Sequence, residues 1–426
     1  MYRDLTVAQL DELKKELTDK YNEYKSLNLK LDMSRGKPGK EQLDLSEKLL
    51  TAVSSNEECY DKNGVDCRNY GIIDGLPEAK EMFADLMNCE FDEVIVGGNS
   101  SLTMMYDTIV RAMLFGVYGG EKPWIQCEDI KFLCPVPGYD RHFTICESLG
   151  IKMINVPLND NGPDMDMVEK LVSEDESIKG IWCVPKYSNP TGVTYSDEVV
   201  RRFARLKPKA KDFRIFWDNA YTLHDVEERT DILLNILSEA KKCGNGDIVY
   251  KFMSTSKVTY PGAGVAAMAA SANNINLLKK QMGPQMIGPD KLNQLRHVRY
   301  FKTADNVRQY MKLHAEIIRP RFEVVGKTLE RELSGLGIAD WSTPNGGYFI
   351  SLNVMEGCAK RTVELLKKVG VTMTEAGATF PYGIDPEDKN IRIAPSYPSV
   401  EELALAMEVL CVCVKLSAVE KLLLSK

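Results

Sequence analysis

The chain has 426 residues, of which 44% are hydrophobic and 27% are charged. This length and apolar content predict a folded protein of two or three domains and exclude intrinsic disorder. The net charge of -7, from 54 basic and 61 acidic side chains, excludes a dedicated nucleic-acid-binding protein and favours a small-molecule ligand.

Targeting segments and metal motifs are not evident. The chain lacks the run of about 18 apolar residues that a transmembrane helix requires, and Arg3 and Asp4 interrupt the N-terminus where a signal peptide needs an apolar core. We therefore expect a cytoplasmic protein with no membrane association. The 11 cysteines and four histidines fit no zinc-binding spacing, so we expect reduced, mostly buried thiols and no metal.

An amphipathic helix is predicted at the N-terminus. Thr6 and Gln9 form a capping box. Apolar side chains then recur at helical spacing at Leu10, Leu13, Leu17, Tyr21 and Tyr24. We expect this helix to pack against another part of the protein.

Short apolar runs alternate with helical stretches between about residues 93 and 265. The predicted strands are residues 94–96, 180–184, 215–217 and 248–252, and the predicted helices include residues 102–114 and 196–206. Alternation of strands and helices is typical of a mainly parallel sheet with helices on both faces.

The pattern changes after about Pro289. A long helix is predicted over residues 307–333, followed by a mixed segment with strands at 347–352 and 390–394 and helices at 362–368 and 400–416. The sequence therefore predicts an α/β protein with a large domain at residues 51–300 and a small α/β domain at residues 301–426. We expect residues 1–50, a helix and an arm, to pack with the small domain.

A candidate phosphate-binding loop follows the first strand of the large domain. Gly97, Gly98, Asn99, Ser100 and Ser101 supply free backbone N–H groups, hydroxyls and the positive end of a helix dipole, which suit a phosphate. Either serine equally fits a plain helix N-cap, so both interpretations stay open. A nominal dinucleotide motif at residues 262–267 lacks the preceding strand and the acidic residue that should follow, which argues against nicotinamide binding.

Three polar motifs follow three predicted strands: Ser188 to Gly192, Asp218 to Tyr221, and Ser254 to Lys257. Because ligands bind at the carboxyl edge of a parallel sheet, we expect these motifs to converge in one crevice. Asp218 emerges from a buried strand, where a carboxylate needs a cationic partner. Lys257 follows another apolar strand, and desolvation there would lower its pKa and prepare it to bond covalently to a carbonyl compound.

With these ordered motifs the chain resembles the class I aminotransferases of the fold-type I pyridoxal-phosphate enzymes, from Arg35 to the C-terminus. The segments SRGKPG from Ser34, CVPKYSNPTG before Val193 and STSKVTYPGAG from Ser254 look most like the bacterial aspartate aminotransferase subgroup Ic. The resemblance implies a large domain that binds pyridoxal 5′-phosphate, a smaller α/β domain and a homodimer.

The resemblance also implies roles for individual residues. Lys257 would hold the cofactor covalently and later move a proton, and Asp218 would pair with the pyridinium nitrogen. Asn189 and Tyr221 would hydrogen-bond the phenolic oxygen, and Tyr139 would stack on the ring. Together these contacts keep the ring an electron sink.

Phosphate contacts and substrate contacts are likewise implied by position. The phosphate would be bound by Asn99, Ser100, Ser101, Ser254 and Ser256, with Tyr70 contributed by a partner subunit. Arg392 would bind the substrate α-carboxylate with its guanidinium fork, close to Asn189 and Gly36.

One position departs from the family pattern. Val265 stands where related enzymes place a phosphate-binding arginine. The phosphate charge must then be met by another cation or by more hydroxyl and backbone donors. The candidate cations, which the sequence does not rank, are Arg35, Lys37, Arg141 and Lys186.

The implied activity is a ping-pong transamination in which L-aspartate and 2-oxoglutarate become oxaloacetate and L-glutamate. A dicarboxylic substrate needs a second cation, for which Arg35, Lys37, Arg141, Arg296 and Arg299 are open choices. The alternatives are an aminotransferase for alanine, aromatic or branched-chain amino acids, or a C–S lyase on the same fold. A non-catalytic regulatory protein is a further alternative, but the residues before Ser34 are too few for a DNA-binding domain.

Overall fold

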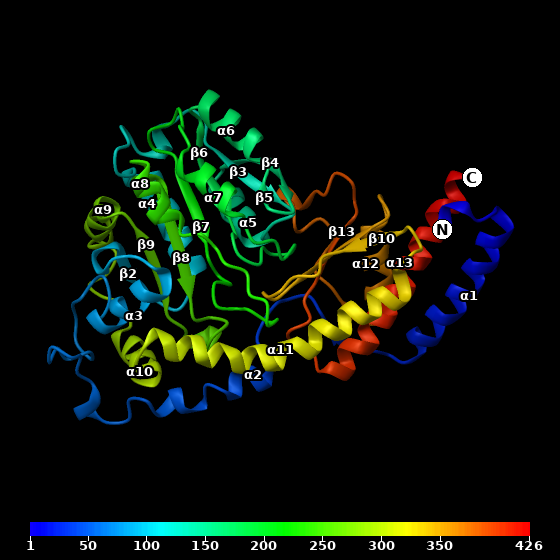
Figure 1. Cartoon of the computed structure of the whole chain (residues 1–426), viewed down its shortest axis with the longest axis horizontal. Helices are drawn as coiled ribbons and strands as arrows, with labels where there is room; N and C mark the ends of the chain where they lie inside the picture. The colour runs from blue at the N-terminus through cyan, green and yellow to red at the C-terminus, as the bar shows by residue number, and fades with distance from the viewer.

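The computed structural model describes residues 1–426, which form a large part built on an eight-stranded sheet and a smaller, elongated part (Figure 1). The sheet has the order β2 (Val94–Val96), β9 (Ala266–Ala270), β8 (Val249–Ser254), β7 (Arg214–Asp218), β6 (Ile178–Cys183), β3 (Lys131–Val136), β4 (Lys152–Asn159) and β5 (Gly162–Pro163). The neighbours from β8 to β4 are parallel, whereas β9 is antiparallel to both neighbours and β5 to β4. The predicted, mainly parallel sheet is confirmed.

Helices cover both faces of this sheet. One face packs against α4 (Ser101–Phe115), α5 (Asp140–Ser148) and α9 (Ala272–Met282), and the other against α6 (Met165–Glu174), α7 (Asp197–Ala204) and α8 (Ile236–Lys242). Strand β7 shows why its residues form a buried strand: Phe216 joins the first cluster, while Ile215 and Trp217 join the second. Successive side chains of a strand point to opposite faces, so a strand buried on both faces is apolar throughout.

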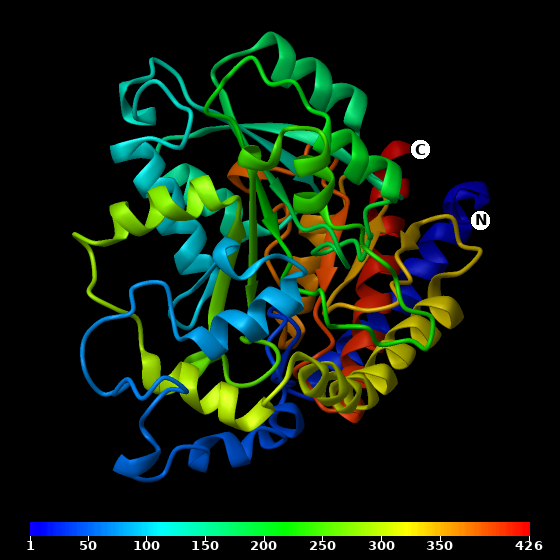
Figure 2. The same ribbon diagram turned by 60° about the vertical axis from the view of Figure 1, so that its left-hand side comes forward.

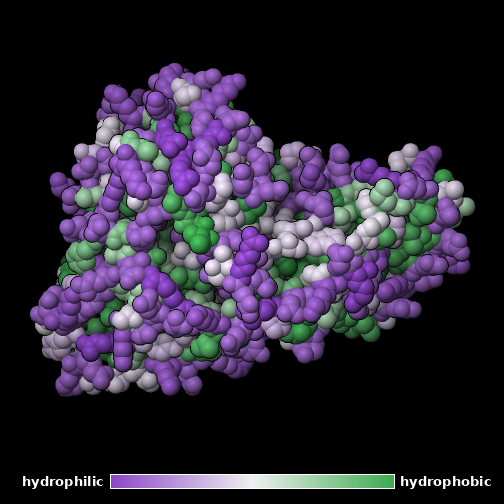
Figure 3. Space-filling model, in the orientation of Figure 1, coloured by the Kyte–Doolittle hydropathy of each residue, from purple (hydrophilic) through white to green (hydrophobic).

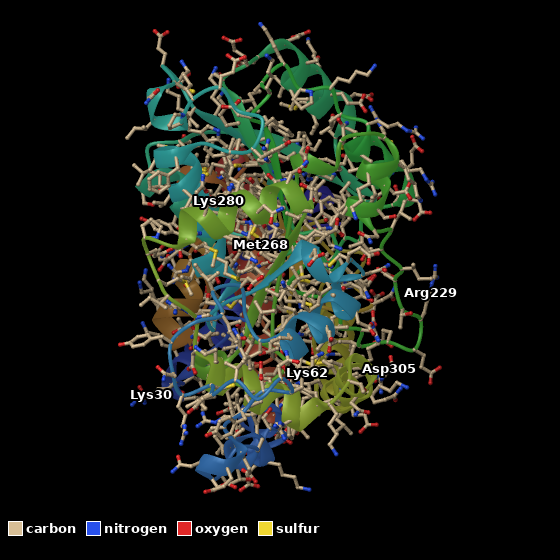
Figure 4. All side chains as sticks on the ribbon, turned by 90° about the vertical axis from the view of Figure 1, so that its left-hand side faces the viewer. Lys30, Lys62, Arg229, Met268, Lys280 and Asp305 are labelled. Atoms are coloured by element: carbon tan, nitrogen blue, oxygen red, sulfur yellow. The ribbon has the colours of Figure 1, made fainter.

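Figure 4 faces the end of the large part near β2 and α9. Met268 of β9 lies near the middle of this view and is buried in the same cluster as the apolar side chains of α9. Two further helices, α3 (Pro77–Met87) and α10 (Lys291–Phe301), pack near β2 in a separate apolar cluster.

The smaller part has its own apolar core. It contains an antiparallel sheet of β10 (Ala339–Trp341), β11 (Ile350–Val354) and β13 (Asn390–Ile393), and a parallel pair of β1 (Leu31–Asp32) and β12 (Val371–Thr372). Its helices are α1 (Val7–Ser26), α12 (Ala359–Val369) and α13 (Val400–Ser425). Helix α13 continues past the predicted end at residue 416 because Ala418, Val419 and Leu422 are also buried in this core.

The N-terminal helix packs into the small core. Leu10, Leu17 and Tyr21 are buried there, and the Tyr21 hydroxyl donates to the carbonyl of Leu365 at 3.0 Å. The predicted capping box is confirmed, with reciprocal hydrogen bonds of 2.8 and 3.3 Å between Thr6 and Gln9. Both chain ends lie together at the tip of the small part in two views (Figures 1 and 2).

Helix α11 (Ala304–Leu333) joins the two parts. Val307 and Met311 lie in an apolar cluster of the large part, whereas Phe322 and Val325 lie in the small core. The helix therefore belongs to both parts, and the predicted division at residues 50 and 300 stays a prediction. Helix α2 (Lys40–Asp44) packs beside α11 where the two parts meet.

The surface drawn in Figure 3 is mainly hydrophilic, with small scattered apolar patches. None of the helices has both the length and the apolar character needed to cross a membrane.

Candidate active site

The three polar motifs meet in a cavity of about 160 Å³ at the carboxyl edge of the large sheet. Its polar lining consists of Ser100, Ser101, Tyr139, Asn189, Asp218, Tyr221, Ser254, Ser256 and Lys257. Asn189 follows β6, Asp218 ends β7 and Lys257 follows β8. These three residues meet because the strands run parallel and end at the same edge of the sheet. The convergence expected from the sequence is present.

Lys257 lies on the turn that follows β8. Its Nζ atom is 4.9 Å from the centre of the Tyr221 ring. Burial lowers the pKa of Lys257, Asp218 acts in the opposite direction, and Arg392 adds to the lowering. A lowered pKa favours the neutral amine, which is the form that can react as a nucleophile or accept a proton.

Asp218 ends β7 and is almost fully buried. Its Oδ2 atom accepts a hydrogen bond from Nε2 of His142 at 3.0 Å, while Oδ1 is buried and has no hydrogen-bond partner. An unpaired carboxylate oxygen in a buried site is costly, so this residue is arranged to receive a proton donor from the cavity. A protonated pyridine nitrogen meets that requirement, and the site therefore fits pyridoxal 5′-phosphate.

Sequence reasoning missed the role of His142 as the partner of Asp218. Its ring stacks on Trp182 with 4.1 Å between ring centres and an interplanar angle of 6°, which holds it in place. The sequence contained one indication that His142 lies near the cavity. It is three residues after Tyr139, a predicted cofactor contact, and the two share a face where α5 begins.

The N-terminus of α4 forms the end of the cavity where phosphate binding is predicted. Ser100 is the N-cap, and its hydroxyl accepts from the Thr103 backbone N–H at 3.4 Å, so the capping interpretation holds for this residue. The hydroxyl of Ser254 donates to that of Ser256 at 3.0 Å, which in turn donates to the carbonyl of Asn99 at 3.3 Å.

The side chain of Asn99 does not line the cavity. Its amide donates instead to the carbonyl of Pro261 at 3.4 Å. Val265 is buried, and its N–H donates to the Thr255 hydroxyl at 2.9 Å. Among the candidate cations, Lys186 is held by Asp225 at 2.8 Å. Lys257 is the only basic residue in the cavity lining.

Arg392 lies on β13 of the small part and is buried. Its Nη1 atom donates to Asp140 at 2.8 Å and to the side-chain oxygen of Asn189 at 3.3 Å, and Nη2 donates to the Thr374 hydroxyl at 3.1 Å. Its Nε atom is buried without a partner. The guanidinium thus bridges the two parts of the molecule and keeps donor capacity for an additional anion.

Gly36 and Tyr70 have different surroundings. Gly36 packs directly against the Phe349 ring, which leaves no room for a side chain at this position. The centre of that ring is 4.9 Å from Cζ of Arg392, so Gly36 lies beside the predicted carboxylate site. Tyr70 is 80% exposed and does not reach the cavity of its own chain.

A buried polar cluster at the junction of the two parts was not predicted. The amide of Gln42 donates to the Tyr348 hydroxyl at 2.7 Å and lies 3.0 Å from Nδ1 of His314. His224 donates to the carbonyl of Lys257 at 3.3 Å and packs edge-on against Tyr348. No sequence motif could reveal this cluster, because Gln42 and His314 are 272 residues apart.

Burial controls the titration of this cluster. It lowers the pKa of His314 to about 4, and it lowers that of His224 well below the usual value, with Lys257 adding to the effect. Both rings are therefore neutral at neutral pH.

Comparison with known proteins extends over nearly the whole chain. The family model for aspartate amino-transferase matches residues 5–426. An aspartate aminotransferase of Corynebacterium glutamicum is 43% identical over 418 residues, covering 98% of this chain and 96% of the relative. The crystal structure of an aspartate transaminase from that organism has a TM-score of 0.96 at 42% identity and covers 99% of both chains. An α-aminoadipate aminotransferase of Thermus thermophilus shares the fold, with a TM-score of 0.74, 19% identity and coverage of 92% of this chain and 93% of its own. The chain therefore belongs to the aspartate aminotransferase family and is an aminotransferase of fold type I.

Proposed function

We propose that the protein transfers the amino group of L-aspartate to 2-oxoglutarate with pyridoxal 5′-phosphate as cofactor. The observation that carries this proposal is the meeting of Lys257, Asn189 and a half-paired Asp218 in one cavity beside Arg392. The choice of aspartate is supported by the relative that is 43% identical and is named for this substrate.

The donors around the cavity match the polar groups of the cofactor. Asp218 Oδ1, which is buried without a partner, would accept a hydrogen bond from the pyridinium nitrogen. The side-chain oxygen of Asn189 already accepts from Arg392, which leaves its amide N–H groups for the phenolic oxygen. Tyr221 would donate to the same oxygen, and Tyr139 would cover the ring, since both side chains line the cavity. When bound, the cofactor withdraws electrons from the substrate α-carbon.

The phosphate is held without a dedicated arginine. Four hydroxyl residues line this end of the cavity: Ser100, Ser101, Ser254 and Ser256. They act together with the backbone N–H groups and the dipole at the start of α4. These neutral donors would compensate for the phosphate-binding arginine of related enzymes, which is replaced by Val265 in this chain.

Two side chains act on the substrate directly. Arg392 binds the α-carboxylate with its free Nε–H and the remaining N–H groups of its fork, and thereby fixes the orientation of the α-carbon. Lys257 Nζ takes the proton from the α-carbon, because its lowered pKa keeps the amine available as a base.

The active assembly is a homodimer. Tyr70 is strongly exposed on a loop that borders a surface hollow lined by residues 67–70 and 285–292. In the dimer Tyr70 would reach the cavity of the partner subunit, where its hydroxyl would donate a hydrogen bond to the phosphate.

The test is an absorption spectrum of the purified protein with bound cofactor, recorded before and after addition of L-aspartate alone. Loss of the visible cofactor band with release of oxaloacetate supports the proposal. A band that responds only to alanine, aromatic or branched-chain donors would show that aspartate is not the substrate. Release of sulfide from cysteine would indicate a C–S lyase instead. Failure to bind the cofactor would contradict the assigned role of Lys257.

A further inference from the structure

The loops of residues 97–101 and 254–257, which carry the proposed phosphate donors, both contact the turn at Gly264. A Cβ atom at Gly264 would come within 3.2 Å of the Thr255 hydroxyl and within 3.3 Å of the Asn99 carbonyl oxygen. The two loops and this turn are therefore packed together at one point. The spacing of the phosphate donors depends on the groups that hold these three segments in place.

Helix α10 holds the turn at Gly264 through Asn293. The side-chain amide of Asn293 donates to the carbonyls of Ala263 and Gly264 at 3.0 and 2.8 Å, and the residue is buried. Val265, which replaces the arginine of related enzymes, packs in the same apolar cluster as Leu295 of α10 and does not line the cavity. The turn therefore contacts α10 through both polar and apolar groups.

The next residue of α10, Gln294, holds the start of the other loop. Its side-chain amide donates to the carbonyls of Val96 and Gly97 at 3.1 and 3.0 Å. Its side-chain oxygen accepts from the Leu76 N–H at 2.8 Å. Gln294 is almost fully buried, so each of these hydrogen bonds is formed away from water, where an unpaired amide would be costly.

These bonds orient a row of free donors. The backbone N–H groups of residues 98–101 donate to no group of the protein. The N–H and C=O of a trans peptide point in opposite directions, so the N–H of Gly98 points away from Gln294, which binds the carbonyl of Gly97. Successive free N–H groups of this kind bind anions such as phosphate.

His297, one turn further along α10, holds the segment around Lys257. Its Nδ1–H donates to the carbonyl of Asn293 at 2.8 Å, which leaves Nε2 to accept from the hydroxyls of Thr259 at 2.9 Å and Thr255 at 3.3 Å. Burial lowers the pKa of His297, so the ring is neutral and Nε2 keeps its lone pair for these hydroxyls.

We propose that Asn293, Gln294 and His297 are positioning residues for the phosphate of the cofactor. None of the three lines the cavity. They fix the three segments so that the free N–H groups and the serine hydroxyls keep the spacing that a phosphate requires. Preorganised donors bind more tightly because little ordering remains to be done on binding, and this compensates for the absent arginine. The inference rests on the phosphate site of the proposed function and does not depend on the identity of the substrate.

The experiment measures the Kd of pyridoxal 5′-phosphate and of pyridoxal, which lacks the phosphate, for the full-length protein after removal of the cofactor. Asn293→Leu removes two hydrogen bonds with little change in size, and Asn274→Leu is the matched control. Asn274 is also a buried amide, but it lies at the other end of β8 and β9, where it donates to the Asp247 carbonyl at 2.8 Å and the Ser271 hydroxyl at 3.0 Å.

We expect Asn293→Leu to weaken binding of pyridoxal 5′-phosphate relative to pyridoxal by about 10- to 100-fold, the usual effect of losing hydrogen bonds to a charged group. Asn274→Leu should leave the ratio of the two Kd values unchanged, even where it lowers the stability of the protein.

The phosphorus-31 NMR signal of the holoenzyme at saturating cofactor provides a second readout that is independent of turnover. In Gln294→Met the signal should move toward that of free pyridoxal 5′-phosphate, whereas in Asn274→Leu it should keep its wild-type position. Thr259→Val is a milder variant that removes only one hydroxyl donor to His297. It should shift the signal in the same direction by a smaller amount, and it keeps the test open if Asn293→Leu does not fold.

Three results would overturn the inference. An equal loss of affinity for both ligands in Asn293→Leu would indicate a general structural role, as would a similar fall of the ratio in Asn274→Leu. An unchanged ratio together with an unchanged phosphorus signal would show that the loops keep their positions without α10. A wild-type protein that binds pyridoxal as tightly as pyridoxal 5′-phosphate would instead overturn the phosphate site itself, and this outcome is visible before any variant is compared.

Discussion

Asp218 shows how a buried carboxylate is prepared for a ligand. Its Oδ2 atom is held by His142, which is itself clamped against Trp182, and its Oδ1 atom has no partner in the protein. Protein groups therefore fix the direction of the carboxylate, and Oδ1 remains available for the cofactor nitrogen that we propose as its partner. Preorganised charge of this kind is effective because it costs no reorganisation during the reaction.

Replacing Asp218 by Asn keeps the shape and removes the charge. We expect kcat to fall by about 10²- to 10³-fold, because the ring nitrogen loses the carboxylate that keeps it protonated. Steady-state kinetics should be paired with cofactor absorbance, which reports occupancy separately. Turnover close to that of the wild type at full occupancy would contradict the role proposed for Asp218.

Replacing Lys257 by Ala should abolish transamination, because the base and the covalent attachment of the cofactor are both lost. The measurement is oxaloacetate formation from L-aspartate in the presence of excess cofactor. Lys280→Ala is the control, since Lys280 is an exposed residue of α9 (Figure 4) and its loss should not affect the rate. Residual activity near the wild-type level in Lys257→Ala would show that another residue is the base.

At the scale of elements, α11 couples the two parts through a neutral buried histidine. The pKa of His314 is lowered to about 4 by burial, below the ordinary value of 6.5. Between these two values the unfolded chain binds a proton that the folded chain does not. Stability from this residue is therefore complete above pH 6.5 and is lost as the pH falls toward 4.

We predict that His314→Gln flattens the acid limb of the stability profile. Each such histidine contributes a slope of about 1.4 kcal/mol per pH unit in this range. Urea unfolding between pH 4 and 7 measures it. Buried His224 and His297 also have lowered pKa values, so part of the slope should remain in the variant. An identical slope in wild type and variant would refute the assignment.

The packing of α1 against the small core can also be tested by urea unfolding. Leu10 of α1 is fully buried in the apolar core of the small part. Leu10→Ala should lower the free energy of unfolding by about 2 to 5 kcal/mol through lost burial and a residual cavity. Val7→Ala is the matched control, because Val7 is in the first turn of the same helix and is 48% exposed. Equal effects of the two substitutions would mean that α1 is not held by its buried face.

At the scale of the whole molecule, the position of Tyr70 predicts a site shared between subunits. A mixture of Tyr70→Phe and Lys257→Ala chains should form hybrid dimers in which one site has both native residues. Partial recovery of activity on mixing, compared with each variant alone, checks the prediction. Absence of recovery despite proven subunit exchange would argue against donation of Tyr70 to the partner.

Local sequence patterns predicted β2, β6, β7 and β8 and the motifs that follow them, but not the other four strands of the large sheet. The apolar run ending at Asp218 predicted β7, and the Thr6–Gln9 pair predicted the start of α1. Such features depend on neighbours a few residues apart, and the spacing of side chains along a helix or strand encodes them directly. Element ends were less predictable, as in α13, because burial against distant residues decides where a helix stops.

What the sequence by itself determined is the fold class, the order of the motifs and the identity of Lys257, Asp218 and Asn189 as a converging set. Only the tertiary structure decided which groups surround them. Asp218 pairs with His142 across 76 residues of sequence, and Arg392 pairs with Asp140 across 252. Gln42 and His314 are 272 residues apart. Contacts over such separations depend on how the large and small parts pack together, and no local periodicity records that packing.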